Sequence, residues 1–317
     1  MKVTVRSFAK INLGLRIGSK RDDGFHELLT VYQTIALHDV IRVSVARGDG
    51  IEILCGDPRV PRDESNTCFR IVERAMAALR AKERVVIEIE KRLPVQGGLG
   101  GASSNAVATL LALERALRKP LSTEERLLVA AEVGSDLPLF LVGGTVLGMG
   151  RGEQVYPLTD LPATPCVVIT PEVGVSTPKA FAEWDQLTLP AASDRMNELG
   201  RGLSAWLSEP YSSAPSHFLR RGGRAGNPLL WLDRAGIEND FEQVVFPEYP
   251  ELREAKRVLV RAGAKYASLS GSGSTLYGLF ASKDAAAKAA KGLRKQGLAA
   301  QATATLPRAA YWKKLFG

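Results

Sequence analysis

The hydrophobic pattern at the start of the chain is typical of β-strands. Between residues 3 and 54, short runs of β-branched and other apolar residues alternate with turns. Such residues favour the pleated, half-buried surface of a sheet. We therefore predict strands at Val3–Phe8, Ile11–Ile17, Thr30–Ala36, Val40–Ala46 and Ile51–Leu54, and a further strand at Val85–Ile89.

Apolar residues recur at helical spacing further along the chain. The predicted helices are Thr67–Arg80, Ser103–Leu117 and Thr123–Glu132, followed by apolar segments at Gly144–Gly148 and Cys166–Thr170. Near the end, a helix, strand, strand, helix, strand order predicts a small α+β sandwich, over Tyr249–Ala262, Tyr266–Ser270, Thr275–Ala281, Lys283–Gln296 and Ala300–Ala304. Residues 187–227 are dense in Pro, Ser, Gly and Arg, which indicates a loop-rich insertion.

Length and composition indicate two domains. A chain of 317 residues with 45% hydrophobic content exceeds the size at which single cores usually divide. No apolar run approaches the ~18 residues that span a bilayer, and Met1 leads into a strand rather than a secretory leader, so we expect a cytoplasmic protein without a membrane partner. Cys55, Cys68 and Cys166 are scattered, which indicates buried fillers rather than disulfides or zinc ligands.

The net charge of +8 raises the alternative of a nucleic-acid binder. The basic residues, however, are mixed with acids or alanines in the predicted helices and do not alternate with aromatic residues as a platform for single strands requires. A basic segment, Leu219–Arg224, lies in the least regular part of the chain. We therefore expect no nucleic-acid partner.

The segment Leu93–Ala106, LPVQGGLGGASSNA, has the composition of a phosphate-binding loop. It places four glycines within five positions, followed by two serines, between a predicted strand and a predicted helix. Glycines let the backbone approach an anion closely, and a helix N-terminus offers unpaired N–H donors and partial positive charge. The loop is neither a Walker loop nor a dinucleotide fingerprint. The alternative is a tight connection that binds nothing.

Two charged residues stand in apolar surroundings elsewhere. Lys10 interrupts the apolar pattern of Phe8–Leu13, and Asp136 lies among apolar residues just after Gly134. A buried acid needs a cationic or hydrogen-bonding partner, and Lys10 is a candidate. Taken singly, the two residues also fit the roles of an edge-strand charge and a helix N-cap. Together with the glycine loop they predict phosphoryl transfer.

Further motifs accompany these three, and with them the chain resembles the GHMP kinase superfamily over most of its length. The matching segments are Ala9–Leu13, Asp23–Leu28, Pro94–Ala106, Gly134–Pro138, Gly150–Glu153, Asn239–Glu242 and Leu269–Ser274. The resemblance implies an α+β fold of two domains. A ribosomal-protein-like N-terminal domain (residues 1–160) would bind nucleotide and catalyse, and a ferredoxin-like C-terminal α/β sandwich (residues 161–317) would close over the substrate.

The Asp-Gly-Phe-His-Glu and Gly-Ser-Asp-Leu-Pro motifs resemble one branch of the superfamily. Those kinases use ATP to phosphorylate the 2-hydroxyl of a cytidine-diphosphate-linked methylerythritol, in the synthesis of isoprenoid precursors. The alternative is another small-molecule kinase of the superfamily, such as a homoserine kinase. The resemblance also implies a monomer or weak homodimer.

The resemblance implies catalytic and nucleotide-binding roles for residues of the motifs. Asp136 would accept the proton of the attacking hydroxyl, and Lys10 would contact the same hydroxyl or the transferred group. ATP would be bound, with Mg²⁺ as its escort and Ser104 as a candidate metal ligand. The implied ATP-binding residues are Asn66, Pro94, Val95, Gln96, Gly97, Gly98, Leu99, Gly100, Gly101, Ala102, Ser103 and Ser104. The alternative role of Asn66 is that of a helix N-cap.

The implied substrate site combines an aromatic clamp with polar contacts. Phe25 and Phe181 would stack on the cytosine and His26 would read its edge. The family usually has Tyr at position 25, so a hydroxyl contact is absent here. The implied substrate-binding residues are Asn12, Phe25, His26, Phe181, Gly271, Ser272 and Gly273. The alternatives are core aromatics, a turn histidine and, at 271–274, a flexible turn.

Overall fold

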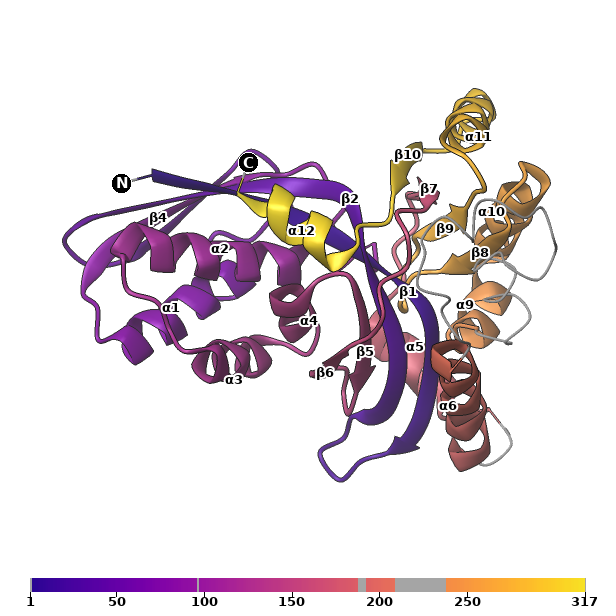
Figure 1. The fold of residues 1–317 in the computed structure, drawn as a ribbon, viewed down its shortest axis with the longest axis horizontal. Helices are drawn as coiled ribbons and strands as arrows, with labels where there is room; N and C mark the ends of the chain where they lie inside the picture. Colours follow the sequence, from indigo (N-terminus) through magenta and orange to yellow (C-terminus); the bar gives the residue numbers. More distant parts are fainter. Residues whose placement is uncertain (1, 96, 188–191, 209–237, 317) are drawn as a thin grey trace. The chain divides into compact units, whose positions relative to one another are not determined.

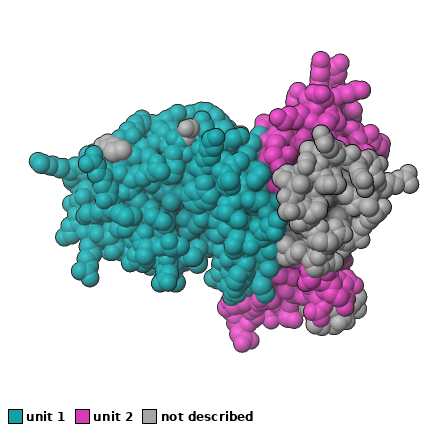
Figure 2. Space-filling model, viewed as in Figure 1, with its two compact units in different colours: residues 1–11, 32–160, 306–317 teal, residues 12–31, 161–305 magenta. Residues whose placement is uncertain are grey.

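The computed structural model describes residues 2–95, 97–187, 192–208 and 238–316 (Figure 1). The chain forms two compact units, each discontinuous in sequence (Figure 2). Unit 1 comprises residues 1–11, 32–160 and 306–317, and unit 2 comprises residues 12–31 and 161–305. The domain limits predicted from the sequence, residues 1–160 and 161–317, stay a prediction. Gln96 and much of the predicted insertion lie outside the described residues.

Unit 1 is built on a mixed sheet with the order β3-β4-β2-β5-β6, and β1 also pairs with β2. The long strands β1 and β2 continue into unit 2 along the chain. Strand β4 pairs antiparallel with β2 and parallel with β3, so the β3–α1–β4 segment is a crossover between neighbouring strands. The strands are β1 (Lys2–Lys20), β2 (His26–Arg47), β3 (Ile51–Cys55), β4 (Glu83–Glu90), β5 (Thr145–Met149) and β6 (Gln154–Pro157).

The described helices of unit 1 are α1 (Thr67–Leu79), α2 (Gly101–Leu117), α3 (Thr123–Val133), α4 (Leu137–Val142) and α12 (Arg308–Leu315). Helix α2 is buried along most of its length, because it packs between the sheet and the helices α1 and α4 (Figure 1). A capping box formed by Ser122 and Glu125 starts α3. One continuous apolar core joins these helices to the sheet.

Unit 2 contains an antiparallel sheet with the order β10-β7-β9-β8. Its strands are β7 (Pro165–Ile169), β8 (Tyr266–Leu269), β9 (Leu276–Leu279) and β10 (Ala300–Ala304). Its described helices are α5 (Thr177–Trp184), α6 (Ala192–Ser208), α9 (Glu242–Glu248), α10 (Pro250–Arg261) and α11 (Lys283–Lys295). Helices α10 and α11 are strongly amphipathic and bury their apolar faces in the core of this unit. The predicted α+β fold is confirmed.

The long strands differ from the sequence prediction in one respect. The hydrophobic pattern predicts interruptions between Phe8 and Ile11 and between Ala36 and Val40, but β1 and β2 are continuous there. The polar residues Lys10 and Asp39 are both buried, and each has an ionic partner. Asp136 is predicted as the partner of Lys10, but the local pattern gives no sign that Lys91 is the partner of Asp39. The helices α4, α5 and α9 and the strand β6 are likewise not predicted.

The prediction for the cysteines is confirmed. The three cysteines are free and buried, and burial raises the pKa of the Cys68 thiol to about 12. Helix α12 packs within unit 1, where the Tyr311 hydroxyl donates to the Phe140 carbonyl at 2.7 Å. In the part of the chain that the structure describes, no helix is both long and apolar enough to cross a bilayer.

Candidate active site

The predicted phosphate-binding loop ends in a turn that only glycine fits well. Gly100 has φ +68° and precedes the first turn of α2, and Gly98 also has positive φ. A Cβ atom built on Gly100 would lie 3.0 Å from Lys10 Cγ and 3.0 Å from Phe140 Cζ. Both the backbone conformation and the close approach of the Lys10 side chain therefore require glycine here. The Lys10 amide also donates to the Leu99 carbonyl at 3.0 Å.

Lys10 and Asp136 lie together beside this loop. Lys10 is 3% exposed, and its Nζ is 3.5 Å from Asp136 Oδ2. Asp136 is the N-cap residue of α4, but its side chain makes no capping hydrogen bond. The carboxylate is about one-third exposed, so one side remains accessible to a ligand. The structure thus brings Lys10, Asp136 and the glycine loop together within unit 1.

Tyr32 is a third member of this cluster that the sequence analysis missed. Its hydroxyl donates to Asp136 Oδ1 at 3.1 Å, and Lys10 Nζ lies 5.6 Å from the centre of its ring. Burial, and then the charge of Asp136, raise the pKa of the Tyr32 phenol well above its ordinary value. Tyr32 therefore keeps its proton and orients the carboxylate. A Cβ on Gly152, whose φ is +100°, would collide with this hydroxyl.

A cavity of about 380 Å³ opens over the glycine loop. The predicted nucleotide-binding residues that the structure describes all line it, with the exception of Ser104. Asn66 lines the cavity and also caps α1, because its Oδ1 accepts from the Cys68 amide at 2.8 Å. Both roles predicted for Asn66 are therefore compatible with its position.

Ser104 is buried, and its hydroxyl is hydrogen-bonded within the protein. Its side chain is 2% exposed, its hydroxyl donates to the Phe8 carbonyl at 2.6 Å, and it accepts from the Ser7 hydroxyl at 2.7 Å. These bonds fasten the first turn of α2 to β1. A metal ion at this oxygen would have to compete with both bonds, so the described geometry fits Ser104 poorly as a ligand of Mg²⁺. The described residues also contain no cluster of three acidic, histidine or cysteine side chains.

A buried ion pair between Asp39 and Lys91 lies beside the nucleotide cavity. The sequence does not predict this pair. Asp39 is fully buried, and its carboxylate accepts from Lys91 Nζ at 2.6 Å and from Asn105 Nδ2 at 3.0 Å. The amides of Arg92 and Leu93 donate to its other oxygen at 2.7 Å each. Lys91 and Asn105 line the nucleotide cavity. Asp39 therefore fixes both ends of the loop.

The predicted substrate residues form a separate group in unit 2. His26 is 6% exposed and stacks on Phe181 with ring centres 4.9 Å apart and planes 10° apart. The Phe181 ring also meets Phe241 edge-on at 4.9 Å. His26 Nε2 lies 2.6 Å from Asp185 Oδ1. The Phe181 ring, which is predicted to stack on a base, is thus already packed by its neighbours.

Asp185 is the ionic partner of His26. Burial alone would raise the pKa of this carboxyl, but hydrogen bonds from His26 and Lys20, together with their charges, hold it below its ordinary value. Asp185 therefore stays ionised and orients the imidazole. Phe25, in contrast, is 52% exposed in the turn between β1 and β2.

The remaining predicted substrate residues are well anchored. Asn12 is buried, and its Nδ2 donates to the Thr30 hydroxyl at 2.8 Å. Asn239 Nδ2 donates to the carbonyls of Leu269 and Gly271, at 2.9 and 2.8 Å. The Ser272 hydroxyl lies 2.6 Å from that of Thr177 at the start of α5. The loop from Gly271 to Gly273 is therefore held at Gly271 and at Ser272.

Comparison with known proteins agrees with these observations. Residues 66–144 match the model for the N-terminal domain of GHMP kinases, and residues 221–299 match the model for their C-terminal domain. The chain is 39% identical over 285 residues to a 4-diphosphocytidyl-2-C-methyl-D-erythritol kinase of Solibacter usitatus, covering 89% of this chain and 82% of that protein.

Solved structures give the same result. A crystal structure of 4-(cytidine 5'-diphospho)-2C-methyl-D-erythritol kinase superposes with a TM-score of 0.72 at 28% identity, covering 96% of this chain and 99% of that one. A homoserine kinase from Cytophaga hutchinsonii superposes with a TM-score of 0.70, covering 96% and 95%, but at 22% identity this likeness shows the fold alone. The chain therefore belongs to the GHMP kinases, and within them to the family of 4-diphosphocytidyl-2-C-methyl-D-erythritol kinases.

Proposed function

We propose that this protein transfers the γ-phosphoryl group of ATP to the 2-hydroxyl of 4-diphosphocytidyl-2-C-methyl-D-erythritol. The products are the 2-phosphate and ADP, and the reaction belongs to the non-mevalonate synthesis of isoprenoid precursors. One observation of the structure carries the chemistry: Lys10 and Asp136 meet beside a glycine loop that lines a nucleotide-sized cavity. The family relationship supplies the identity of the substrate.

The chemistry follows from the positions of these side chains. Phosphoryl transfer has a loose transition state, so catalysis depends mostly on alignment and charge neutralisation. The loop amides and the start of α2 would bind phosphate oxygens. Asp136 would accept the proton of the attacking hydroxyl, while Tyr32 orients the carboxylate and Lys10 neutralises charge on the transferred group.

Recognition of the cytidine is the proposed role of the unit 2 group. His26, oriented by Asp185, would read the edge of the base, and Phe181 and Phe25 would provide apolar faces. For the cytosine to bind between the rings of Phe25 and Phe181, the Phe181 ring would have to replace part of its contact with His26 by contact with the base. Asn12 and the Gly271–Gly273 loop would contact the polar remainder of the substrate.

Mg²⁺ is proposed to bind together with the nucleotide. When bound, it would neutralise charge on the phosphate oxygens. Because the described residues offer few ligands, we propose that phosphate oxygens and water hold it, with Ser104 the weaker candidate. A cytoplasmic location and a monomer or weak homodimer complete the proposal, and sedimentation of the purified protein tests the oligomeric state.

A coupled assay of ADP release tests the function. The purified chain is given the cytidyl substrate, homoserine and mevalonate side by side, each with ATP and Mg²⁺. We expect turnover with the cytidyl substrate alone. Turnover with homoserine alone would overturn the proposed substrate while leaving the kinase family intact.

A further inference from the structure

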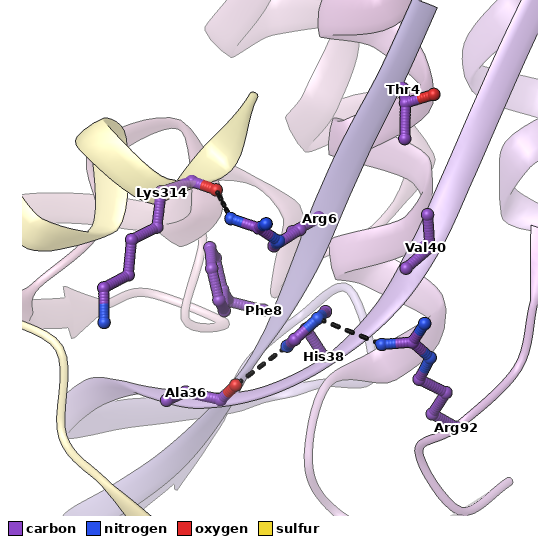
Figure 3. A pocket seen from close by; sticks show the side chains of 8 residues that line it. All are labelled: Thr4, Arg6, Phe8, Ala36, His38, Val40, Arg92 and Lys314. Carbon is purple, nitrogen blue, oxygen red and sulfur yellow. Dashed lines mark hydrogen bonds between the residues drawn. The ribbon is translucent and has the colours of Figure 1, made fainter. Parts of the chain in front are cut away.

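Unit 1 contains a second cavity that is distinct from the nucleotide cavity. Its volume is about 610 Å³, within the range of small-molecule sites, and none of its described lining residues also lines the nucleotide cavity (Figure 3). Alternate residues of the two long strands face it, because side chains two positions apart share one face of a strand. These are Thr4, Arg6 and Phe8 of β1 and Ala36, His38 and Val40 of β2.

The opposite face of β1 packs against α2, where Ser7 contacts Ser104. The cavity is therefore on the face of the β1–β2 pair that α2 does not cover. Arg92, after β4, and Lys314, on α12, complete the lining (Figure 3). Strands β1 and β2, the residue Arg92 after β4 and helix α12 therefore line the same cavity.

The charged side chains that line this cavity have one sign. Arg6, Arg92 and Lys314 are basic, and no acidic side chain is among the described residues that line it. Arg92 pairs with Glu90 at 2.5 Å. Arg6 donates to the neutral carbonyl of Lys314 at 2.9 Å, and within the described residues neither Arg6 nor Lys314 forms an ion pair. Two positive charges therefore remain without a carboxylate in the described structure.

His38 holds Arg92 at the rim of the cavity. Its Nδ1 lies 2.9 Å from the Ala36 carbonyl, which can only accept, so Nδ1 carries a proton. Its Nε2 lies 3.3 Å from Arg92 Nη1, which can only donate, so Nε2 is the acceptor. The imidazole is thus neutral in this arrangement and adds no charge of its own. Figure 3 shows the Arg92 guanidinium pointing toward the His38 ring, and its Nε donates to Glu90 at 2.9 Å.

The apolar part of the lining indicates an organic ligand. The ring of Phe8 lies 5.3 Å from that of His38, and Val40 and Ala36 extend the apolar surface along β2. Several cations match a doubly charged phosphate better than a singly charged carboxylate. We propose that this cavity binds a small phosphorylated organic molecule, with its phosphate at Arg6 and Lys314, the two cations without a carboxylate, and its apolar part against Phe8 and Val40.

Calorimetric titration of the full chain with hexyl phosphate and with inorganic phosphate tests this proposal. The nucleotide cavity is first saturated with a non-hydrolysable ATP analogue and Mg²⁺. We expect hexyl phosphate to bind, and inorganic phosphate to bind at least about fivefold more weakly because it lacks the apolar part. Equal affinities, or no binding of either probe, would overturn the proposal.

Two charge variants and a matched control locate the binding. R6Q and K314Q should each weaken hexyl phosphate binding about fivefold to tenfold, because each removes a charged donor. K119Q, an exposed lysine of unit 1 outside the cavity, should leave it unchanged. K314Q retains the backbone carbonyl that Arg6 contacts, so it tests the proposal even where R6Q fails to fold.

Two further readouts distinguish a phosphate cavity from a membrane-facing patch and from the kinase site. Kinase turnover of K314Q should equal that of the parent chain, so the proposal can fail independently of the proposed function. Vesicles containing phosphatidic acid should not co-sediment the protein. Co-sedimentation that R6Q abolishes would show a membrane-facing patch instead, and unchanged hexyl phosphate affinity in both charge variants would show binding elsewhere.

Discussion

The glycine loop of unit 1 and the His26 group of unit 2 are held in place by different kinds of contact. Around the loop, the main chain itself is constrained, by the positive φ of Gly100, the Lys10–Leu99 hydrogen bond and the amides that donate to Asp39. Around His26, side chains hold one another through the Phe181 stack and the Asp185 hydrogen bond. A constrained main chain suits the binding of a phosphate group, which always has the same shape. Packed side chains, in contrast, can rearrange around a larger ligand.

The largest expected effect is that of D136N. It keeps the size of the side chain but removes the proposed base, so we expect turnover to fall about 10³-fold while ATP still binds. Steady-state kinetics and calorimetric ATP binding measure the two properties. The exposed D49N is the matched control of unit 1. Near-normal turnover of D136N would contradict the proposed role of Asp136 as the catalytic base.

The next largest effect tests the main-chain scaffold directly. G100A introduces a Cβ at positive φ, 3.0 Å from Lys10 and Phe140, and should lower kcat/KM about 10²-fold through displacement of Lys10. The backbone strain should also cost about 1–3 kcal/mol of unfolding free energy. In G56A, the added Cβ meets nothing within 4 Å and φ is not positive. Equal kinetics of G100A and G56A would contradict the scaffold.

A smaller effect is expected for Y32F, which removes the hydroxyl that donates to Asp136 and retains the ring. A hydrogen bond to a carboxylate contributes about 1.5–3 kcal/mol, so kcat should fall about tenfold or more. Because Tyr32 contacts the proposed base, KM for both substrates should change little. A rise in KM without a change in kcat would indicate that Tyr32 binds substrate instead.

The smallest effect is expected in unit 2. D185N removes the partner of His26 and should raise KM for the cytidyl substrate about threefold, with KM for ATP unchanged. The lowered pKa of Asp185 means that its contacts stabilise the fold above the ordinary aspartate pKa and are lost as pH falls through the lowered value. Melting temperatures of the parent and D185N should therefore differ at pH 6 and approach each other as pH falls from about 4 through the lowered pKa.

The same comparison shows how much the sequence predicts. The glycine loop is a local motif, so its position at the start of α2 and in the lining of the nucleotide cavity follows from adjacent residues. Lys10 and Asp136 are predicted as partners because each is a charge in apolar surroundings. Their catalytic roles, and the roles of the loop residues, stay predictions.

The contacts that the sequence analysis missed join residues far apart in the chain. Tyr32 reaches Asp136 across 104 positions, and His26 reaches Asp185 across 159. A tyrosine in a strand and an aspartate at a helix end are ordinary residues in their local setting. Only the fold reveals that each supports a candidate site residue. The stack of Phe181 on His26 was missed for the same reason.

Helix α12 gives unit 1 an unusual assembly order. Tyr311 donates to the Phe140 carbonyl, and the Leu306 amide donates to the Thr34 carbonyl, so segments far apart in the chain are joined in one body. Helix α12 must therefore be synthesised before this body can be completed, although the glycine loop is synthesised some 200 codons earlier. Residues 161–305, which form most of unit 2, are synthesised in that interval, so unit 1 can be completed only after most of unit 2 has been made.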